Sequence, residues 1–476
     1  MIKSWDIFDT LIARKFVSPR SVFEIVEQIS KIKNFMAIRI AAEQNLIRQG
    51  LNYNLEDIYE EFQKITDAPK NLCDALKNLE VKVELDQCIP ITENLRQVKA
   101  GDILISDMYL PEKVIRDMLE KVGLFVPIEI VITSGGKASG KVWKEFSEQG
   151  KFLFHMGDNK SSDINQPRKY GFESALPVSS QPNIFEQWLM QRDFQFGAYL
   201  REIRLRNPFT EEIKRTYWTL FTMNVGILII LVQLIDKLQK RYGFEYLGFC
   251  GRDTYFMRLL YQKYKKDRNE IPADNDYLYY SRKLVRYAAA DIGKYFSSRI
   301  AGRKALMIDL TGTGVHLNNL RINENLNYAI LIALLIKRND NTDFVKKLYP
   351  NEKSYPEDWI YFDDAGSDSD VYFKNFTFFD GGNQNMEFIN RAPHNTPIRL
   401  NAFQIGEKII PDVIFSEIND AENYDVIETC FKEAVNSKII WCSESPALIE
   451  TLKGLLKIFL DISHNRLLCD SHSRNI

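Results

Sequence analysis

The chain has 476 residues, more than the roughly 100–200 residues of a typical domain, and this length predicts at least two domains. With 45% hydrophobic and 26% charged residues, its composition is that of a globular protein that folds around buried cores. The 62 basic and 64 acidic side chains give a formal net charge of −2, so the overall charge does not favour binding to nucleic acid or to an anionic membrane.

Three local features predict a cytoplasmic protein without a membrane span. The six cysteines form no CxxC pair and no Cys/His cluster at zinc-ligand spacing, so we interpret them as reduced thiols. The chain enters a strand-like stretch directly, without the long apolar core of a signal peptide. The apolar run at residues 225–232 is well short of the ~20 residues that a membrane span needs, and it predicts a buried helix.

The first 185 residues predict a parallel α/β sheet with a helical insertion. Residues 1–11 form the first strand, and from Ser21 the apolar positions recur at helical spacing. Strand signals then return, each followed by a polar turn and a helical stretch, at residues 102–106, 128–133 and 152–156. We expect a sheet core made of residues 1–11 and 98–185, with a helical cap at residues 12–97.

The second half of the chain, residues 196–476, predicts another α/β domain. Its strand candidates alternate with helical stretches and lie at residues 246–250, 277–280, 305–309 and 328–336. The segment after Ile409 has a helical pattern, and we expect it to form a helical tail.

Polar residues follow each predicted strand of the first domain. They are Asp6, Asp9 and Thr10; Ser106 and Asp107; Ser134 and Lys137; and Asp158 and Asp163. Ligands bind at the carboxyl ends of parallel strands, so we expect these side chains to meet. A carboxylate can attack phosphorus, further carboxylates hold Mg²⁺, and a hydroxyl and an ammonium group neutralise the phosphate oxygens. The set predicts Mg²⁺-dependent phosphoryl transfer.

Four segments, in this order, resemble the four motifs of the haloacid-dehalogenase-like (HAD) superfamily. They are Asp6-Ile7-Phe8-Asp9-Thr10-Leu11, then Ile105-Ser106-Asp107-Met108, then Lys137 after Ser134-Gly135-Gly136, and last Gly157-Asp158 with Asp163. The amino-acid sequences of these motifs also resemble those of large bacterial HAD proteins associated with surface polysaccharide biosynthesis. The resemblance covers about residues 1–180. It implies a Rossmann-like core and a phosphatase or phosphotransferase acting on a small phosphorylated metabolite such as a sugar phosphate.

The same resemblance assigns roles to individual residues. Asp6 is the nucleophile, and Mg²⁺ is bound by Asp6, Asp158 and the backbone carbonyl of Phe8, with Asp163 supporting the metal. The phosphate contacts are assigned to Thr10, Ser106, Asp107 and Lys137. Lys141 is an alternative for the role of Lys137. We favour Lys137 because Lys137 begins the helix that faces the site.

Phe8 departs from the phosphatase pattern, because most HAD phosphatases have an acid/base aspartate two residues after the nucleophile. Three interpretations follow. A distorted loop lets Asp9 act as the acid/base; a cap residue or a substrate group supplies the proton; or hydrolysis is slow because the domain transfers phosphate or has lost turnover. Dehalogenation is disfavoured because the chain keeps both Asp158 and Asp163.

Within the predicted cap, Arg39, Glu43 and Arg48 lie at near-helical spacing on one face. Two interpretations remain for this set. The side chains contact the substrate, or they form an exposed face of ion pairs.

Candidate residues of the second domain follow its predicted strands. Strand, polar turn and helix in succession can bind an anion, because free backbone N–H groups face the ligand. The candidates are Arg252 and Asp253; Ser281 and Arg282; and Asp309 and Thr313. Glu387 and His394 belong to a further polar cluster, in which His394 is either a catalytic base or only hydrogen-bonded. The Asp309 segment faintly resembles the phosphoribosyl-diphosphate loop of phosphoribosyltransferases.

Two alternatives to the phosphatase interpretation therefore stay open. One is a bifunctional protein with a C-terminal glycosyl- or phosphoribosyl-type transferase domain. The other is a non-catalytic HAD scaffold that binds a phosphorylated ligand, which the Phe8 substitution favours.

Overall fold

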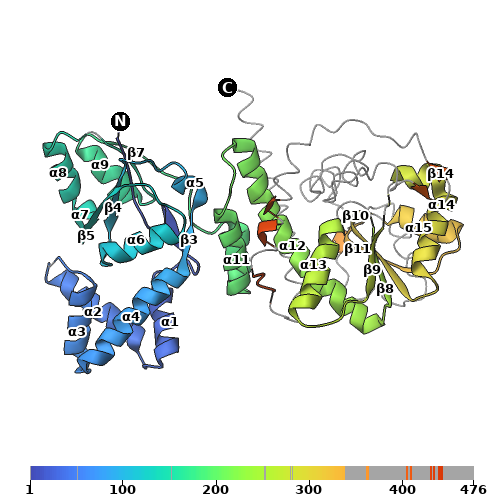
Figure 1. Ribbon diagram of the computed structural model, residues 1–476, viewed down its shortest axis with the longest axis horizontal. Coiled ribbons are helices and arrows are strands. Elements are labelled where there is room, and N and C mark those ends of the chain that lie inside the picture. The colour runs from blue at the N-terminus through green and yellow to red at the C-terminus, as the bar shows by residue number, and fades with distance from the viewer. Residues whose placement is uncertain are drawn as a thin grey trace. The chain divides into compact units, whose positions relative to one another are not determined.

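The chain folds into two compact units, Met1–Arg215 and Thr216–Ile476, each with its own parallel sheet (Figure 1). The computed structural model describes residues 2–50, 52–151, 153–250, 254–278, 280, 282–312 and 314–337, and short segments at 361–363, 404–405, 408–409, 429–430, 432–434 and 438–442. The predicted α/β class is confirmed. The predicted domain limits, 1–185 and 196–476, stay predictions.

The sheet of the first unit has five strands in the order β5-β4-β1-β6-β7, and every neighbouring pair is parallel. The strands are β1 (Ile2–Trp5), β4 (Ile103–Asp107), β5 (Glu129–Thr133), β6 (Leu153–Met156) and β7 (Glu173–Ala175). Trp5 pairs with Leu104 on one side and with Met156 on the other. The strand order reverses at β1, and this is where ligands bind in open parallel sheets.

Helices cover both faces of this sheet because side chains alternate along each strand. Leu104 packs into the same cluster as Ile115 of α6 (Glu112–Lys121), whereas Ile103 and Ile105 pack against Trp143 of α8 (Lys141–Glu148). The other helices between β5 and β7 are short: α7 (Gly136–Ser139), the π-helix η1 (Lys160–Asn165) and α9 (Gln166–Lys169). Two further helices complete the unit, α10 (Ile184–Met190) and α11 (Phe194–Leu205).

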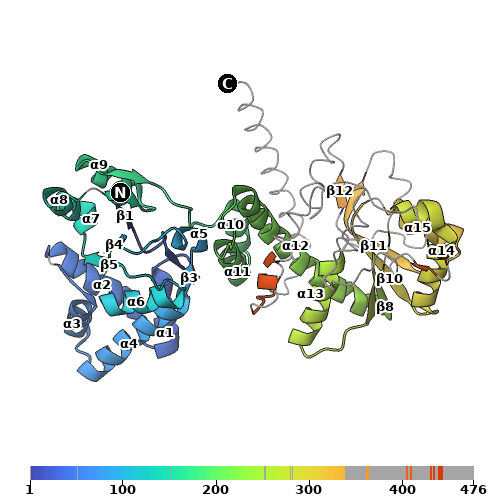
Figure 2. The ribbon, with the colours of Figure 1, turned by 45° about the horizontal axis from the view of Figure 1, so that its top comes forward.

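The segment between β1 and β4 is mostly helical, and its first four helices lie together at one side of the unit (Figures 1 and 2). Its helices are α1 (Arg20–Ser30), α2 (Phe35–Arg48), α3 (Leu55–Thr66), α4 (Lys70–Gln87) and the short α5 (Thr92–Leu95). The chain enters and leaves this insertion through an antiparallel pair, β2 (Ile12–Arg14) and β3 (Cys88–Pro90). The sequence did not predict this pair, since three residues are too few to show strand alternation.

Two buried ion pairs hold the insertion together: one joins α2 to α4, and the other joins β2 to α4. Arg39 is completely buried, and its Nε donates to Glu80 Oε2 at 2.9 Å, where Tyr59 also donates at 2.8 Å. Arg14 Nε donates to Glu84 Oε2 at 2.8 Å, one helical turn further along α4. The expectation that Arg39 belongs to an exposed face is therefore wrong: the charge is neutralised inside the fold and does not face solvent.

The second unit also has a five-stranded sheet, in the order β12-β11-β10-β8-β9, and its paired strands are parallel. Its elements are α12 (Glu212–Tyr242), β8 (Tyr246–Cys250), α13 (Thr254–Asp267), β9 (Asp274–Leu278), α14 (Arg282–Ile300), β10 (Ala305–Gly312), α15 (Val315–Asn323), β11 (Ala329–Lys337), β12 (Tyr361–Asp363), β13 (Gln404–Ile405) and β14 (Lys408–Ile409). The strand candidates of the sequence fall on β8, β9, β10 and β11. Most of the predicted helical tail lies outside the described residues.

The apolar run at residues 225–232 lies in the middle of α12, and its side chains are buried, as predicted. Among the helices in the described residues, none combines the length and the apolar character that crossing a membrane requires.

Removing one partner of a buried ion pair leaves an uncompensated charge, which typically costs about 3–5 kcal/mol. We expect Arg39→Met to lower the free energy of unfolding by about that amount in urea titrations. Arg48→Met, at the exposed end of the same helix, is the matched control and is expected to change it by less than about 0.5 kcal/mol. Equal effects of the two substitutions would contradict the structural role of Arg39.

Candidate active site

The loop after β1 closes on itself and gives Asp6 a fixed place at the strand end. Asp6 N donates to Met156 O at 2.8 Å, Ile12 N donates to Ile7 O at 3.0 Å, and Asp9 N donates to Ile12 O at 2.7 Å. These bonds pass over Phe8, whose carbonyl accepts no hydrogen bond within the described part of the chain. The Phe8 carbonyl, two residues after Asp6, is therefore unbonded in the described part of the chain.

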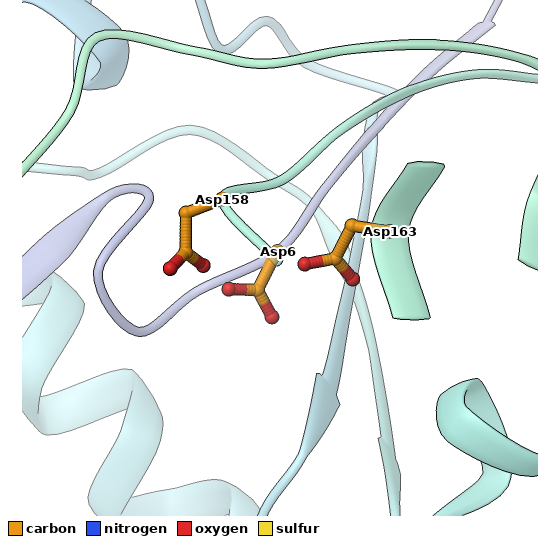
Figure 3. Close-up of side chains that lie close together, drawn as sticks. All are labelled: Asp6, Asp158 and Asp163. Carbon is orange, nitrogen blue, oxygen red and sulfur yellow. The ribbon is translucent and has the colours of Figure 1, made fainter. Parts of the chain in front are cut away.

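Three carboxylates meet at the carboxyl end of the sheet (Figure 3). Asp6 follows β1, Asp158 follows β6, and Asp163 lies on η1. Their ligand oxygens lie within 4.8 Å of one another, and Figure 3 shows Asp6 between the other two. Asp158 is the most accessible of the three to solvent, whereas Asp6 and Asp163 are buried.

Lys137 is the cation of this cluster. Its Nζ contacts Asp6 Oδ1 and lies 2.8 Å from Asp163 Oδ1, and the side chain is buried. Burial alone lowers the pKa of Lys137, but attraction to Asp6 and Asp163 outweighs that effect and raises the pKa above its ordinary value. Lys141, the alternative candidate, is exposed on α8.

Asp107 holds the short helix that carries this lysine. Its carboxylate accepts hydrogen bonds from the backbone N–H groups of Lys137 at 3.0 Å and Ala138 at 3.1 Å, and from the hydroxyl of Thr133. The residue was expected to contact phosphate, but these bonds engage both of its oxygens at the start of α7. The contact that the structure shows is the positioning of Lys137.

Two hydroxyl groups stand beside the carboxylates. Thr10 Oγ1 lies 3.2 Å from Asp6 Oδ2 and 3.4 Å from Asp158 Oδ1, so its single proton is shared between two acceptors. Ser106 is buried at the end of β4, the strand that pairs with β1. Thr10 thus contacts Asp6 directly, and Ser106 lies on the strand beside the one that Asp6 follows.

Asp163 is fixed by a buried histidine that the sequence analysis missed. His155 Nε2 lies 3.4 Å from Asp163 Oδ1, and His155 Nδ1 lies 2.9 Å from Ser4 Oγ. Burial lowers the pKa of His155 to about 4, so the ring is neutral near pH 7 and donates its single N–H to Asp163. No role was assigned to this residue from the sequence, because its contact with Asp163 appears only in the folded chain.

Gly157 makes the close approach of Asp163 possible. A Cβ atom at this position would lie 2.5 Å from the Cβ of Asp163. Asn159 N then donates to Asp163 Oδ2 at 3.1 Å, and the Asn159 side chain accepts from the backbone N–H groups of Ser161 and Ser162. The turn that contains Asp158 and Asp163 is thus fixed by its own backbone.

The electrostatics of the cluster fit a hard divalent cation. Burial, followed by repulsion from Asp163 and Asp158, raises the pKa of Asp6 to about 7 although Lys137 opposes the rise. Burial together with Asp9 and Asp163 raises the pKa of Asp158 to about 6. For Asp163, burial acts in the same direction, but the His155 hydrogen bond and Lys137 hold its pKa well below the ordinary value. A bound cation would reduce this repulsion among the carboxylates. Carboxylate oxygens are hard ligands, which suit a hard metal ion.

Asp9 and Phe8, the two residues before Thr10, each contact a side chain outside the three-carboxylate cluster. Asp9 has a positive φ of 58°, and its Oδ1 accepts a 2.8 Å hydrogen bond from Ser180 Oγ. The Phe8 ring lies 4.6 Å from the guanidinium carbon of Arg14. The loop distortion considered from the sequence is present. It lets Asp9 bond to Ser180, while the Asp9 carboxylate stays close enough to Asp158 to raise the pKa of that group.

Six of the eight candidate residues of the second unit lie outside the part of the chain that the structure describes. They are Arg252, Asp253, Ser281, Thr313, Glu387 and His394. Arg282 is the first residue of α14, and Asp309 lies half-buried on β10 next to β8. The anion-binding hypothesis for this unit stays a prediction.

No known protein family matches the chain, and no curated protein is similar enough in sequence to count as a relative.

Protons and a cation compete for the same carboxylates. Because the pKa values of Asp6 and Asp158 are raised to about 7 and about 6, both groups take up protons as the pH falls below 7. We expect Mg²⁺ affinity, measured by isothermal titration calorimetry, to fall by about tenfold or more between pH 8 and pH 5.5. A Mg²⁺ affinity that stays constant over this range would contradict the site.

Proposed function

We propose that residues 1–215 form a Mg²⁺-dependent phosphoryl-transfer module of the HAD type, in which Asp6 becomes an aspartyl phosphate. The proposed substrate is a small phosphorylated metabolite such as a sugar phosphate. Two findings support the proposal together: the acidic cluster lies where the strand order reverses at β1, and the four motifs follow four different parallel strands.

The observation that carries the proposal is the buried contact of Lys137 Nζ with Asp6 and Asp163. A nucleophilic carboxylate must hold its charge in a site that excludes water, and a neighbouring ammonium keeps it there. The same ammonium can neutralise the oxygens of a phosphoryl group that approaches Asp6. An ordinary surface cluster of aspartates would have neither the buried lysine nor the helix that Asp107 fixes for it.

The proposed first step forms one bond and breaks one. An oxygen of Asp6 attacks the phosphorus atom of the substrate, and the ester P–O bond breaks with its electron pair leaving on the departing oxygen. That oxygen takes its proton from water, since Phe8 has no proton to give. The second step transfers the phosphoryl group from Asp6 to water or to another hydroxyl group, and the Asp6 carboxylate is regenerated.

The cation would be held by Asp6, Asp158 and the Phe8 carbonyl, because Asp163 already accepts bonds from Lys137, His155 and Asn159. When bound, Mg²⁺ supplies positive charge that lowers the repulsion between Asp6 and an anionic phosphoryl group. Thr10 and Ser106 are the hydroxyl groups available to the phosphoryl oxygens.

Phe8 supports transfer, or a long-lived aspartyl phosphate, over rapid hydrolysis. Phe8, whose ring packs against Arg14, carries no acid or base, and one oxygen of Asp9 is engaged by Ser180. A general acid or base typically contributes about 10²–10⁴-fold to such a step. The same observation favours the second candidate function, a scaffold that binds a phosphorylated ligand without turning it over.

The biological setting rests on resemblance. The amino-acid sequences of the motifs resemble those of HAD proteins associated with bacterial surface polysaccharide biosynthesis, and we propose a cytoplasmic role in that process. A transferase activity of the second unit remains a separate hypothesis, which binding assays with nucleotide sugars and phosphoribosyl diphosphate would test.

Asp6→Asn keeps the size of the side chain but removes the nucleophile. We expect it to lower Mg²⁺-dependent release of phosphate from a panel of sugar phosphates by about 10³-fold or more. Asp117→Asn, an exposed aspartate on α6, is the matched control and should retain activity. Undiminished activity of Asp6→Asn would overturn the nucleophile assignment.

A second measurement separates transfer from binding alone. The full-length chain is mixed with a phosphate ester and Mg²⁺, and intact-mass analysis with hydroxylamine treatment detects an acyl phosphate. A phosphorylated form that is absent from Asp6→Asn supports the proposal. Ligand binding without phosphorylation by the wild-type chain would favour the non-catalytic scaffold.

A further inference from the structure

A buried arginine on α11 lies next to the loop that carries Asp6. Arg201 is completely buried; its Nε donates to Ser180 O at 2.7 Å, and its Nη1 donates to Arg14 O at 2.8 Å. One bond reaches the segment that follows β7, and the other reaches β2 at the end of the Asp6 loop. A single guanidinium group therefore ties three separate parts of the chain together.

The same guanidinium group is incompletely paired. Within the described residues its Nη2 has no hydrogen-bond partner although it is buried. Burial lowers the pKa of Arg201 to about 10, and among the neighbouring charges Asp9 does most to oppose this effect. An incompletely paired buried cation is costly to keep in a fold. Its retention beside the active-site loop calls for a role there.

Ser180 connects this arginine to Asp9. The Ser180 side chain is buried, its carbonyl accepts from Arg201, and its Oγ donates to Asp9 Oδ1 at 2.8 Å. A second connection runs in parallel, because Asn94 Nδ2 donates to Thr10 O at 2.7 Å and to Val178 O at 3.0 Å. The segment 178–180 thus holds both residues that follow Phe8.

We propose that Arg201 and Ser180 are positioning residues of the active site, which act through Asp9 to hold the Phe8 carbonyl and the Thr10 hydroxyl in place. This inference rests on the proposed function. It assigns Asp9 to the support of the loop and leaves it no part in proton transfer. It also extends the functional module beyond the parallel sheet, to the end of α11.

The backbone of Asp9 explains why an aspartate suits this position. Its φ of 58° lies in the left-handed region, which Asp and Asn adopt more readily than other residues with a side chain. Its carboxylate accepts the Ser180 hydrogen bond from this conformation. Asparagine can keep both the conformation and the acceptor oxygen. Alanine has no acceptor oxygen, and its backbone would be strained in this conformation.

The test compares Mg²⁺ affinity among full-length variants by isothermal titration calorimetry. Ser180→Ala and Arg201→Met are each expected to weaken Mg²⁺ binding about fivefold or more. Asp9→Ala should weaken it about tenfold, and Asp9→Asn by no more than about threefold. If Asp9 were the acid/base residue, turnover would fall as far in Asp9→Asn as in Asp9→Ala, since neither side chain can carry the proton.

Two matched controls separate positioning from general destabilisation. Ser179→Ala removes an exposed hydroxyl next to Ser180. Arg204→Met, on the same helix as Arg201, breaks a partly buried ion pair with Glu186 of α10. We expect both controls to bind Mg²⁺ within about twofold of the wild-type affinity, even where Arg204→Met lowers the melting temperature as much as Arg201→Met does.

The outcomes distinguish this inference from the proposed function. Ser180→Ala and Arg201→Met binding Mg²⁺ as tightly as the two controls would overturn the inference, as would Asp9→Asn losing as much affinity as Asp9→Ala. A wild-type chain that binds Mg²⁺ but forms no aspartyl phosphate would overturn the proposed function and leave the comparison of variants valid. A wild-type chain that does not bind Mg²⁺ would overturn both.

Discussion

The buried contact between Lys137 and the carboxylates of Asp6 and Asp163 is the constraint on which the rest of the first unit depends. A lysine without partners would lose its proton in such a place, and three carboxylates without a cation would repel one another. Much of the local structure meets these two demands. Asp107 fixes the turn that carries Lys137, His155 fixes Asp163, and the absence of a side chain at Gly157 lets the acidic turn approach.

Much of this site could be predicted from the sequence because parallel strands bring their carboxyl ends to one edge. Asp6, Lys137, Asp158 and Asp163 each follow an apolar run of strand length, and the structure places all four within one cluster. The chemistry that they perform is a separate matter, and it stays a proposal. Residue types at strand ends indicate which atoms meet, but they do not indicate which reaction follows.

Other features could not be predicted, for physical reasons that differ from case to case. Arg39 lies in a helix with charged neighbours, so its burial depends on Glu80, a partner 41 positions away. Arg201 stands far from every motif, and only the folded chain brings it to Arg14 and Ser180. The antiparallel pair β2 and β3 is too short to show alternation, and its pairing joins residues on opposite sides of the insertion.

That antiparallel pair also bears on how such a protein can change over evolutionary time. The insertion enters and leaves at Arg14 and Cys88, which are paired neighbours, so another insertion of different length can be joined at the same two points without moving the sheet. One condition limits such an exchange. Arg14 is neutralised by Glu84, which belongs to the insertion, and a replacement has to bring its own acidic partner for that arginine. The helical segment can therefore be exchanged only if the replacement also supplies a carboxylate for Arg14.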